Sequence, residues 1–580
     1  MSERTRARFV AMGAIALVSV AGALAACSGA SPMQPAGAYG TGDAGAGDVA
    51  TPDAGTPDAG APDAADGGTP DAGTADASPD ASPAGPPTLV ALGVTGPAPG
   101  DAGAPITLVP PFSPQVHDYY VRCEAGDNVL TVSMTASDGA SGLLVQPTTS
   151  PSLPQQSLSV SVAEGQAIVA AATDGEATAE YWVRCLPHDF PQLQWTPHLQ
   201  AGATTPGYYL VGSALQTTTS GCYAMVLDDD GVPVWYSKAE PGAGWCVFDV
   251  DDAVSGAISF DSVVDSPSQF EIHQLSPLAT TRIASPPGVN IDLHDFRPLP
   301  NGDYLVISSP LQSGVDLTGM VMPQPTGGTE TLSGPQTIMA CDLVELKPDG
   351  TIAWSWSATD HFDAVKDSVA PTLTPYGPEN NSLVIDPFHC NSIDVDPGNG
   401  NLLVSAREMS SIFYIEKSTG KVLWKMGGAT YSKDGATYVS VADPFALQHD
   451  ARFQPDWSSA SGGGSGHISL FDDESYTTTP ARAVVYDVAV GDAGATGTAT
   501  VSWQYKGATS SVAMGSFRIM PDGSRVIGWG LVQGGGFTEV DAAGDDLLDF
   551  AFADSNTTYR AIKVPLGAYD LGVLRSTAGV

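Results

Sequence analysis

Short runs of alternating apolar and polar residues recur along the chain from about residue 88 onward. Between residues 88 and 187 the runs are TLVALGVTG, HDYYVRC, NVLTVSMTAS, SLSVSVAEG, QAIVAAATDG and AEYWVRC. A period of two is typical of strands with one buried face, and turn residues separate these runs. The pattern predicts a small β-sandwich over residues 88–189.

The rest of the chain repeats a longer pattern. Four segments align with a proline six positions after their first residue: HDFRPLPNG from His294, NSIDVDPGNG from Asn391, HDARFQP from His449 and GSFRIMPDG from Gly515. Each precedes an apolar strand, and a second hairpin ending in aromatic residues follows, as in LKPDGTIAWSW and IEKSTGKVLWKMGG. Two hairpins per unit are typical of a four-stranded propeller blade.

Counting these units predicts an all-β protein in which residues 190–580 form a six-bladed β-propeller. The units begin near Leu193, Trp245, His294, His389, His449 and Gly515. A ring of seven or eight blades is the structural alternative, because the insertions at 311–340 and 360–388 have room for irregular strands.

Composition supports this fold class and excludes some partners. Only 15% of the 580 residues are charged, while 65 glycines and 46 prolines favour short strands and turns over long helices. The net charge of −41 disfavours binding to nucleic acid or to anionic membrane surfaces.

The N-terminus has the features of an export signal. Residues 1–27 combine a basic start, an apolar run from Phe9 to Val20 and small residues ending in LAAC at Cys27. The run is shorter than the roughly 18–20 apolar residues of a membrane span. LAAC resembles the bacterial lipoprotein signal, in which Cys27 would be the acylated first residue, and Ser28 favours the outer membrane. An ordinary cleaved signal is the alternative.

A polar linker follows the signal. Residues 28–87 repeat TPDAG and related sequences and contain no lysine or arginine. Such a segment has almost nothing apolar to bury, so we expect a disordered tether. The chain is therefore predicted to be an exported lipoprotein of the cell envelope that contacts the membrane only through its lipid.

Six cysteines remain after Cys27, and an even number in an exported chain favours disulfides. Cys123 and Cys185 end two similar strands, YYVRC and YWVRC, so their pairing is the clearest prediction. Cys222 with Cys246, and Cys341 with Cys390, are the other expected pairs. The spacing does not resemble a zinc site, because no CxxC occurs.

Candidate chemistry gathers at equivalent repeat positions. The first strand of each blade lies beside the propeller axis, so residues that begin these strands should meet at one mouth of the channel. His294 and His449 share one repeat position, Asn391 matches them, and His389 lies two residues earlier. Each histidine alone could be a polar residue in a wet channel, but together they indicate a built site.

A hairpin argument adds a cation to this ring. Opposing residues of an antiparallel hairpin have a constant sum of numbers, and the turn DPGNG centres near Gly398. His389 and Arg407 are equally distant from that turn and should flank each other. Imidazoles, an amide and a guanidinium at one mouth would form an anion site.

Further charged residues are assigned to structural roles. Arg297, Arg452 and Arg518 share another repeat position, where ion pairing between blades is expected. Asp450 follows His449 on a strand and should face away from it, because alternate residues point to opposite sides.

The segment from Pro387 to Gly428, followed by FALQHDARF and HISLFDDES, resembles the bacterial arylsulfotransferase family. The elements HxNSI, SxR, IxxIxxxTGxxxWxxGG and QHD occur in the family's order. The resemblance implies a six-bladed propeller that moves a sulfuryl group from a phenolic sulfate ester to another phenol without a nucleotide or other cofactor. The N-terminal runs resemble a bacterial cadherin-like β-sandwich domain.

The resemblance also implies roles for individual residues. His449 would be the nucleophile, His389 and Arg407 would hold the sulfuryl oxygens, His294 would be the remaining active-site histidine, and Asn391 would bind substrate. Two departures from the family pattern are LFDDES in place of LFDN and the absence of a cysteine pair shortly before QHD. The alternatives are a non-catalytic, lipid-anchored propeller that binds an anionic ligand or surface partner, and a hydrolase that uses water as acceptor.

Overall fold

The computed structural model describes residues 86–96, 106–215, 217–240, 245–262, 269–323, 328–376, 382–491, 496–532 and 535–579. The predicted signal, the acylated Cys27 and nearly all of the predicted tether lie outside the described residues. Within them, no helix has both the length and the apolar character needed to cross a bilayer.

Two sheets near the start of the described chain form a sandwich around their own core. Burial alternates along β3, where Leu130, Val132 and Met134 face inward between exposed neighbours. This is the period-two pattern expected of a strand with one buried face. One sheet has the order β1 (Leu89–Thr95), β3 (Asp127–Ala136), β5 (Gln155–Ala163), and the other β2 (Asp118–Arg122), β7 (Thr178–Leu186), β6 (Ala167–Thr173), β4 (Ser141–Gln146).

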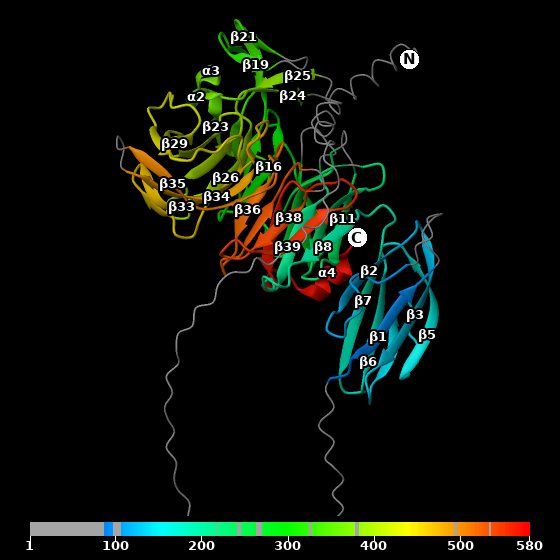
Figure 1. Ribbon diagram of the computed structural model, residues 1–580. Helices are drawn as coiled ribbons and strands as arrows, with labels where there is room; N and C mark the ends of the chain where they lie inside the picture. Colours follow the sequence, from blue (N-terminus) through cyan, green and yellow to red (C-terminus); the bar gives the residue numbers. More distant parts are fainter. Residues whose placement is uncertain are drawn as a thin grey trace, which may run out of the picture. The chain divides into compact units, whose positions relative to one another are not determined.

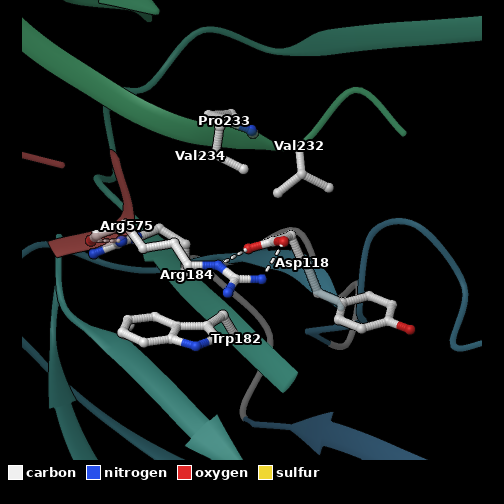
Figure 2. A pocket seen from close by; sticks show the side chains of 9 residues that line it. Asp118, Trp182, Arg184, Val232, Pro233, Val234 and Arg575 are labelled. Atoms are coloured by element: carbon white, nitrogen blue, oxygen red, sulfur yellow. Dashed lines mark hydrogen bonds and ion pairs between the residues drawn. The ribbon is translucent and has the colours of Figure 1, made fainter. Parts of the chain in front are cut away.

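The C-terminal helix α4 (Leu571–Thr577) contacts this sandwich through one arginine (Figure 2). Arg575 donates to both carboxylate oxygens of Asp118 at 2.7 and 2.5 Å. Its guanidinium lies 5.4 Å from the ring centre of Trp182, and its backbone carbonyl accepts from Arg184 at 2.7 Å. Sequence reasoning did not anticipate this contact, which joins residues more than 450 positions apart.

Six runs of four antiparallel strands make up most of the remaining chain (Figure 1). Central strands such as β9, β10, β27 and β28 are buried at every position, as expected for sheets covered on both faces. From the innermost strand outward, the first three sheets are β40 (Ala561–Pro565), β9 (Gly207–Gly212), β10 (Cys222–Leu227), β11 (Pro233–Ala239); β12 (Val247–Asp251), β13 (Ala257–Ser262), β14 (Phe270–Leu275), β15 (Leu278–Ile283); and β16 (Ile291–Pro298), β17 (Tyr304–Ser308), β22 (Asp342–Leu346), β23 (Ile352–Ser357).

The other three sheets continue the same pattern. They are β26 (Cys390–Val395), β27 (Leu402–Ala406), β28 (Ser411–Ile415), β29 (Val422–Gly427); β31 (His449–Phe453), β33 (Gly463–Asp472), β34 (Arg482–Val490), β35 (Gly497–Lys506); and β36 (Ser516–Ile519), β37 (Arg525–Gly528), β38 (Phe537–Val540), β39 (Asp546–Phe552). The strand β30 (Thr437–Val441) joins β29 to β35 by parallel pairing, and β32 (Ser458–Ala460) pairs with β33.

The innermost strands contact one another in cyclic order. β12 contacts β16, and contacts continue through β26, β31 and β36 to β40, which returns to β12. The predicted fold class, an all-β protein with propeller-like sheets, is confirmed. The described residues contain six such runs of four antiparallel strands, and the number of blades stays a prediction.

The ring begins and ends differently from the sequence-based prediction. The segment near Leu193 was expected to start a unit, but β8 (Leu193–Pro197) is an added edge strand beside β39 in the last sheet. The innermost strand of the first sheet is instead β40, from the end of the chain, which pairs with β9. The prediction was wrong because an outer-edge strand and a first strand share the same local alternation.

The two long insertions form a separate sheet between the third and fourth runs. Its order is β18 (Leu311–Asp316), β21 (Pro335–Met339), β25 (Ser382–Asp386), β24 (Thr372–Tyr376). The segment between β18 and β21 forms a separate two-stranded hairpin of β19 (Val321–Pro323) and β20 (Thr329–Thr331). The short helices α2 (Ala358–His361), α3 (Ala364–Asp367) and η3 (Leu566–Ala568) complete the described elements.

The predicted cysteine pairs are all confirmed. Disulfides join Cys123 to Cys185, Cys222 to Cys246 and Cys341 to Cys390. In the last of these disulfides, Cys390 lies between the predicted site residues His389 and Asn391 in sequence. The bond to Cys341 therefore anchors the backbone between them.

Candidate active site

Three imidazoles from three innermost strands lie together. His294 is in β16, His389 comes directly before β26, and His449 is the first residue of β31. The ring centre of His294 lies 4.9 Å from that of His389 and 6.4 Å from that of His449. The repeat alignment therefore identified residues that are neighbours in space.

Each of these imidazoles has a carboxylate on its Nδ1 atom, which sequence reasoning missed. With Nδ1 engaged, Nε2 is the nitrogen left for another partner, and the carboxylate fixes the orientation of the ring. Two of the acids precede their histidine by two or three residues, a local signal that was available in the sequence. The pairs are His294 with Asp292, His389 with Asp386 at 2.7 Å, and His449 with Asp473 at 2.7 Å.

The surroundings of His389 and His449 shift the pKa values of these two imidazoles in opposite directions. Burial by itself lowers the pKa of His389, but the charge and hydrogen bond of Asp386 raise it to about 9. For His449, burial together with the nearby positive charges of Arg407 and of protonated His389 holds the pKa well below its usual range. At neutral pH the site therefore contains a protonated imidazole next to a neutral one.

Arg407 lies beside His389, as the hairpin argument predicted. Its backbone N–H donates to the carbonyl of His389 at 2.9 Å. Its side chain is 4% exposed; Nη1 donates to both oxygens of Glu408, and Nη2 donates to Ser475 and to the Val512 carbonyl. The buried Nε has no hydrogen-bond partner among the described residues, so one donor of the guanidinium remains free.

The register behind this contact differs from the one assumed. In the hairpin, Ser392 pairs with Ser405. The residue numbers of this pair therefore sum to one more than expected from a turn centred on Gly398. A bulge between Cys390 and Ser392 shifts the pairing by one, so that Cys390 faces Ala406. His389 and Arg407 therefore meet because of the bulge, and not because of an unbroken ladder.

Asn391 does not join the imidazoles in the way that its repeat position suggested. It is fully buried, its side-chain amide donates to the backbone carbonyl of Gln448 at 2.7 Å, and its backbone carbonyl accepts from Arg560 at 2.8 Å. His389 has a φ of 50°, which interrupts the regular strand alternation on which the prediction of a shared face depended. The free Oδ1 of Asn391 is buried without a hydrogen-bond partner.

A network of ion pairs is built around charged residues that follow the site histidines on the same innermost strands. Arg452 donates through Nε to Asp450, through Nη1 to the Ile393 carbonyl and through Nη2 to Asp295. The remaining pairs are Arg518 with Asp450, Arg297 with Asp295 and Asp251, and Arg560 with Asp249, Asp295 and Asp450. The predicted role of Arg297, Arg452 and Arg518 is thus supported, and Asp450 faces away from His449. Arg560 was not anticipated.

The backbone is strained at several positions around the site. Non-glycine residues with a positive φ in or next to it include His389 (50°), Asp450 (58°), Tyr476 (62°) and Met514 (70°). Such conformations cost about 1–3 kcal/mol each and persist only where the surroundings enforce them. The described residues contain no group of three or more His, Cys, Asp or Glu side chains arranged to hold a metal ion.

An apolar cluster borders the imidazoles on one side. The ring centre of Tyr559 lies 5.7 Å from that of His294 and 5.2 Å from that of Phe248, and Met514 packs with both aromatic residues. Trp245 and Leu293 are partly buried against this cluster. The site therefore combines charged groups with an apolar wall, as a small organic anion requires.

Comparison with solved structures gives only distant likenesses. They include TolB from Acinetobacter baumannii (12% identity, 70% of this chain and 80% of that chain, TM-score 0.31), a protein from Lactobacillus plantarum (12% identity, 62% and 100%, TM-score 0.30) and the Dos1 propeller (10% identity, 58% and 68%, TM-score 0.26). Scores this low carry no argument about this chain. No curated protein matches the sequence significantly.

The comparison with protein families is informative. The family described as Arylsulfotransferase (ASST) matches residues 271–553, a range that contains the three clustered histidines and Arg407. This is the family that the motifs from Pro387 to Ser475 resemble. Residues 271–553 of this chain are thus similar to the arylsulfotransferase (ASST) family.

Proposed function

We propose that this protein is a nucleotide-independent aryl sulfate sulfotransferase that works through a sulfohistidine intermediate. Similarity to the family supports aryl sulfotransferase activity in general, with an aryl sulfate as donor and a phenol as acceptor. The observation that carries the specific mechanism is the cluster of His294, His389 and His449 next to a buried arginine with an unpartnered Nε.

His449 is the nucleophile of this mechanism. Its side chain is 1% exposed, and its low pKa leaves it neutral at physiological pH. The 2.7 Å hydrogen bond between Nδ1 and Asp473 leaves the electron pair of Nε2 for attack when Nδ1 carries the proton. The same hydrogen bond fixes the orientation of the ring, while burial raises the pKa of the Asp473 carboxyl group well above its usual range.

Arg407 and the neighbouring imidazoles bind the sulfuryl oxygens. The free Nε–H of Arg407 is a charged donor in a buried site, where hydrogen bonds to an anion are stronger than in water. Because Glu408 and Ser475 hold the rest of the guanidinium, it needs no rearrangement when charge develops on the transferring group.

His389 is the general acid and base. Its raised pKa, about 9, keeps it protonated at neutral pH, so it can donate a proton to a leaving phenolate. In the first step the His449 Nε2–S bond forms, the S–O(aryl) bond breaks, and the phenolate oxygen takes the proton of His389. In the second step His389 removes the proton of the acceptor phenol, whose oxygen bonds to sulfur as the N–S bond breaks.

We further propose that the enzyme acts outside the cytoplasm as a lipoprotein of the cell envelope. The LAAC sequence at Cys27 and the polar tether support this location. The three disulfides add support, because such bonds persist in oxidising compartments.

The decisive experiment mixes the purified protein with 4-nitrophenyl sulfate, with and without phenol. We expect phenol to accelerate nitrophenolate release, and intact-mass analysis without acceptor to detect a sulfuryl adduct on the peptide that contains His449. Release that does not respond to phenol would indicate a hydrolase. Binding of the ester without turnover would indicate the non-catalytic alternative.

His467 offers a matched control for His449. It also pairs with an aspartate, Asp456 at 2.6 Å, but its side chain is 38% exposed and lies outside the cluster. His467→Ala should retain both the adduct and the turnover.

A further inference from the structure

One short segment contacts both the proposed nucleophile and the proposed anion-binding residue. Asp473 binds Nδ1 of His449 at 2.7 Å, and two residues later the Ser475 hydroxyl accepts from Nη2 of Arg407 at 3.1 Å. Both side chains are almost completely buried. The backbone that leads into the next residue, Tyr476, is therefore fixed by the contacts of Asp473 and Ser475 with the site.

Tyr476 is unusual among the aromatic residues of this protein. Its side chain is 73% exposed, and among the aromatic residues whose exposure the structure describes, all the others are buried or half-buried. Its ring centre lies 5.8 Å from the Cζ atom of Arg407. An exposed ring contributes little to a core, so packing does not explain why an aromatic residue occupies this position.

The backbone around Tyr476 is also unfavourable for a bulky residue. Tyr476 has a φ of 62° and Glu474 a φ of 49°, both in the left-handed region. Glycine or asparagine adopts this conformation at lower cost than tyrosine. This large ring is held beside the guanidinium of Arg407, whose buried Nε has no hydrogen-bond partner in the described chain, and such an arrangement fits an additional contact with a bound ligand.

We propose that Tyr476 is a specificity-determining residue that contacts the aromatic ring of the sulfate ester and favours aryl over alkyl sulfates. This inference rests on the proposed function, because it assumes that the sulfate group binds at Arg407. A sulfate on the free Nε of Arg407 leaves its ester substituent near the Tyr476 ring, which offers a face for stacking. The substituent reaches solvent on that side, so rings of different size can be accepted.

Equilibrium binding separates this contact from catalysis. His449→Ala serves as the parent, since it cannot form the adduct, and calorimetry measures its affinity for 4-nitrophenyl sulfate, butyl sulfate and inorganic sulfate. Adding Tyr476→Ala should weaken 4-nitrophenyl sulfate binding about fivefold, which is the usual size of one aromatic contact. Affinities for butyl sulfate and inorganic sulfate should change less than twofold.

Two further variants make the outcome specific. Tyr476→Phe retains the ring and should bind like the parent, whereas an equal loss in Phe and Ala would assign the effect to the hydroxyl and overturn the proposal. Leu199→Ala removes an 80% exposed apolar side chain elsewhere and should have no effect. Equal affinities of the parent and Tyr476→Ala for the aryl ester also overturn the proposal.

The proposed function can fail separately from this inference. If the wild type shows no sulfuryl transfer but the aryl-specific difference persists, Tyr476 contacts an aryl anion in a binding protein. If the wild type transfers sulfuryl groups and Tyr476→Ala shows the same preference for aryl over alkyl donors, the contact is refuted while the enzyme stands.

Discussion

Arg407 and Arg452 are two buried arginines near the innermost strands that differ in how many of their guanidinium nitrogens have hydrogen-bond partners. Both are buried, at 4% and 6% exposure. The Nε, Nη1 and Nη2 atoms of Arg452 each have an oxygen partner, whereas the Nε of Arg407 has none. In Arg452 all three nitrogens are engaged, two of them in contacts with other sheets, whereas the unpartnered Nε of Arg407 is available to a ligand.

The same contrast separates two adjacent residues. His449 faces the imidazole cluster and is neutral, while Asp450 is surrounded by arginines. Burial by itself raises the pKa of Asp450, but Arg518, Arg452 and Arg560 hold it well below the usual range. We therefore expect His449 to serve catalysis and the adjacent Asp450 to serve stability. Variants of the two residues test this division.

The largest expected effect is on catalysis at His449. Replacing it with alanine should reduce sulfuryl transfer by about 10⁴-fold or more, as loss of a covalent nucleophile usually does. The melting temperature should change little compared with the effect of Asp450 variants. Steady-state kinetics and thermal unfolding on the same preparation check both, and substantial residual transfer would remove His449 from its assigned role.

Asp450→Asn should have the opposite profile. Its removal leaves the buried guanidiniums of Arg518 and Arg452 without their shared partner, and breaking a buried pair typically costs about 3–5 kcal/mol. We expect a clearly lower urea midpoint. Asp456→Asn, at the exposed pair with His467, is the matched control and should cost less than about 1 kcal/mol. Similar midpoints for the two variants would contradict the structural role of the network.

Arg407→Lys should lower activity by about 10²-fold, the usual effect of losing one donor to a developing anion. Lysine keeps the positive charge but cannot reproduce both the Nε donor and the bonds to Glu408 and Ser475. The conservative Arg452→Lys is the comparison: it should affect the unfolding midpoint more than kcat. If Arg407→Lys retained full activity, the free Nε would have no function.

The smallest expected effect concerns pH. Because the pKa of His389 is raised to about 9, activity that depends on its proton should fall as the pH rises through 9. Asp386→Asn removes the charge that raises this pKa, so the alkaline limb should move to lower pH. The stability linked to this proton is fully present below the unfolded pKa of about 6.5 and is lost toward pH 9. An alkaline limb that does not move in Asp386→Asn would assign the proton to another group.

Local patterns predicted the parts of the fold that depend on neighbours in sequence. Alternation identified the strands of the sandwich, and the proline repeat aligned His294 with His449 across two sheets. Similar strand ends paired Cys123 with Cys185. Alternation could not tell that the strand at Leu193 is an outer edge, because its place depends on pairing with a strand about 350 residues away.

The candidate site was predicted in part for the same reason. His294, His389, His449 and Arg407 stood out because they recur at repeat or hairpin positions. Asp473, Glu408 and Tyr476 have no such position. Glu408 binds its sequence neighbour Arg407, Asp473 binds His449 from the end of the neighbouring strand, and Tyr476 reaches Arg407 from another part of the chain. Asn391 occupied the right repeat position, but a bulge and the positive φ of His389 give it other partners.

By itself, the sequence determined which segments become strands, which strands are equivalent and which cysteines lie close enough to pair, because these follow from a period of two and from a repeated turn. Only the tertiary structure decided which nitrogen of each imidazole is engaged, that the Nε of Arg407 has no partner among the residues described and that Tyr476 stands exposed beside it. Hydrogen bonding and charge depend on distances of a few ångströms between residues far apart in the chain, and those distances exist only once the ring of sheets has closed.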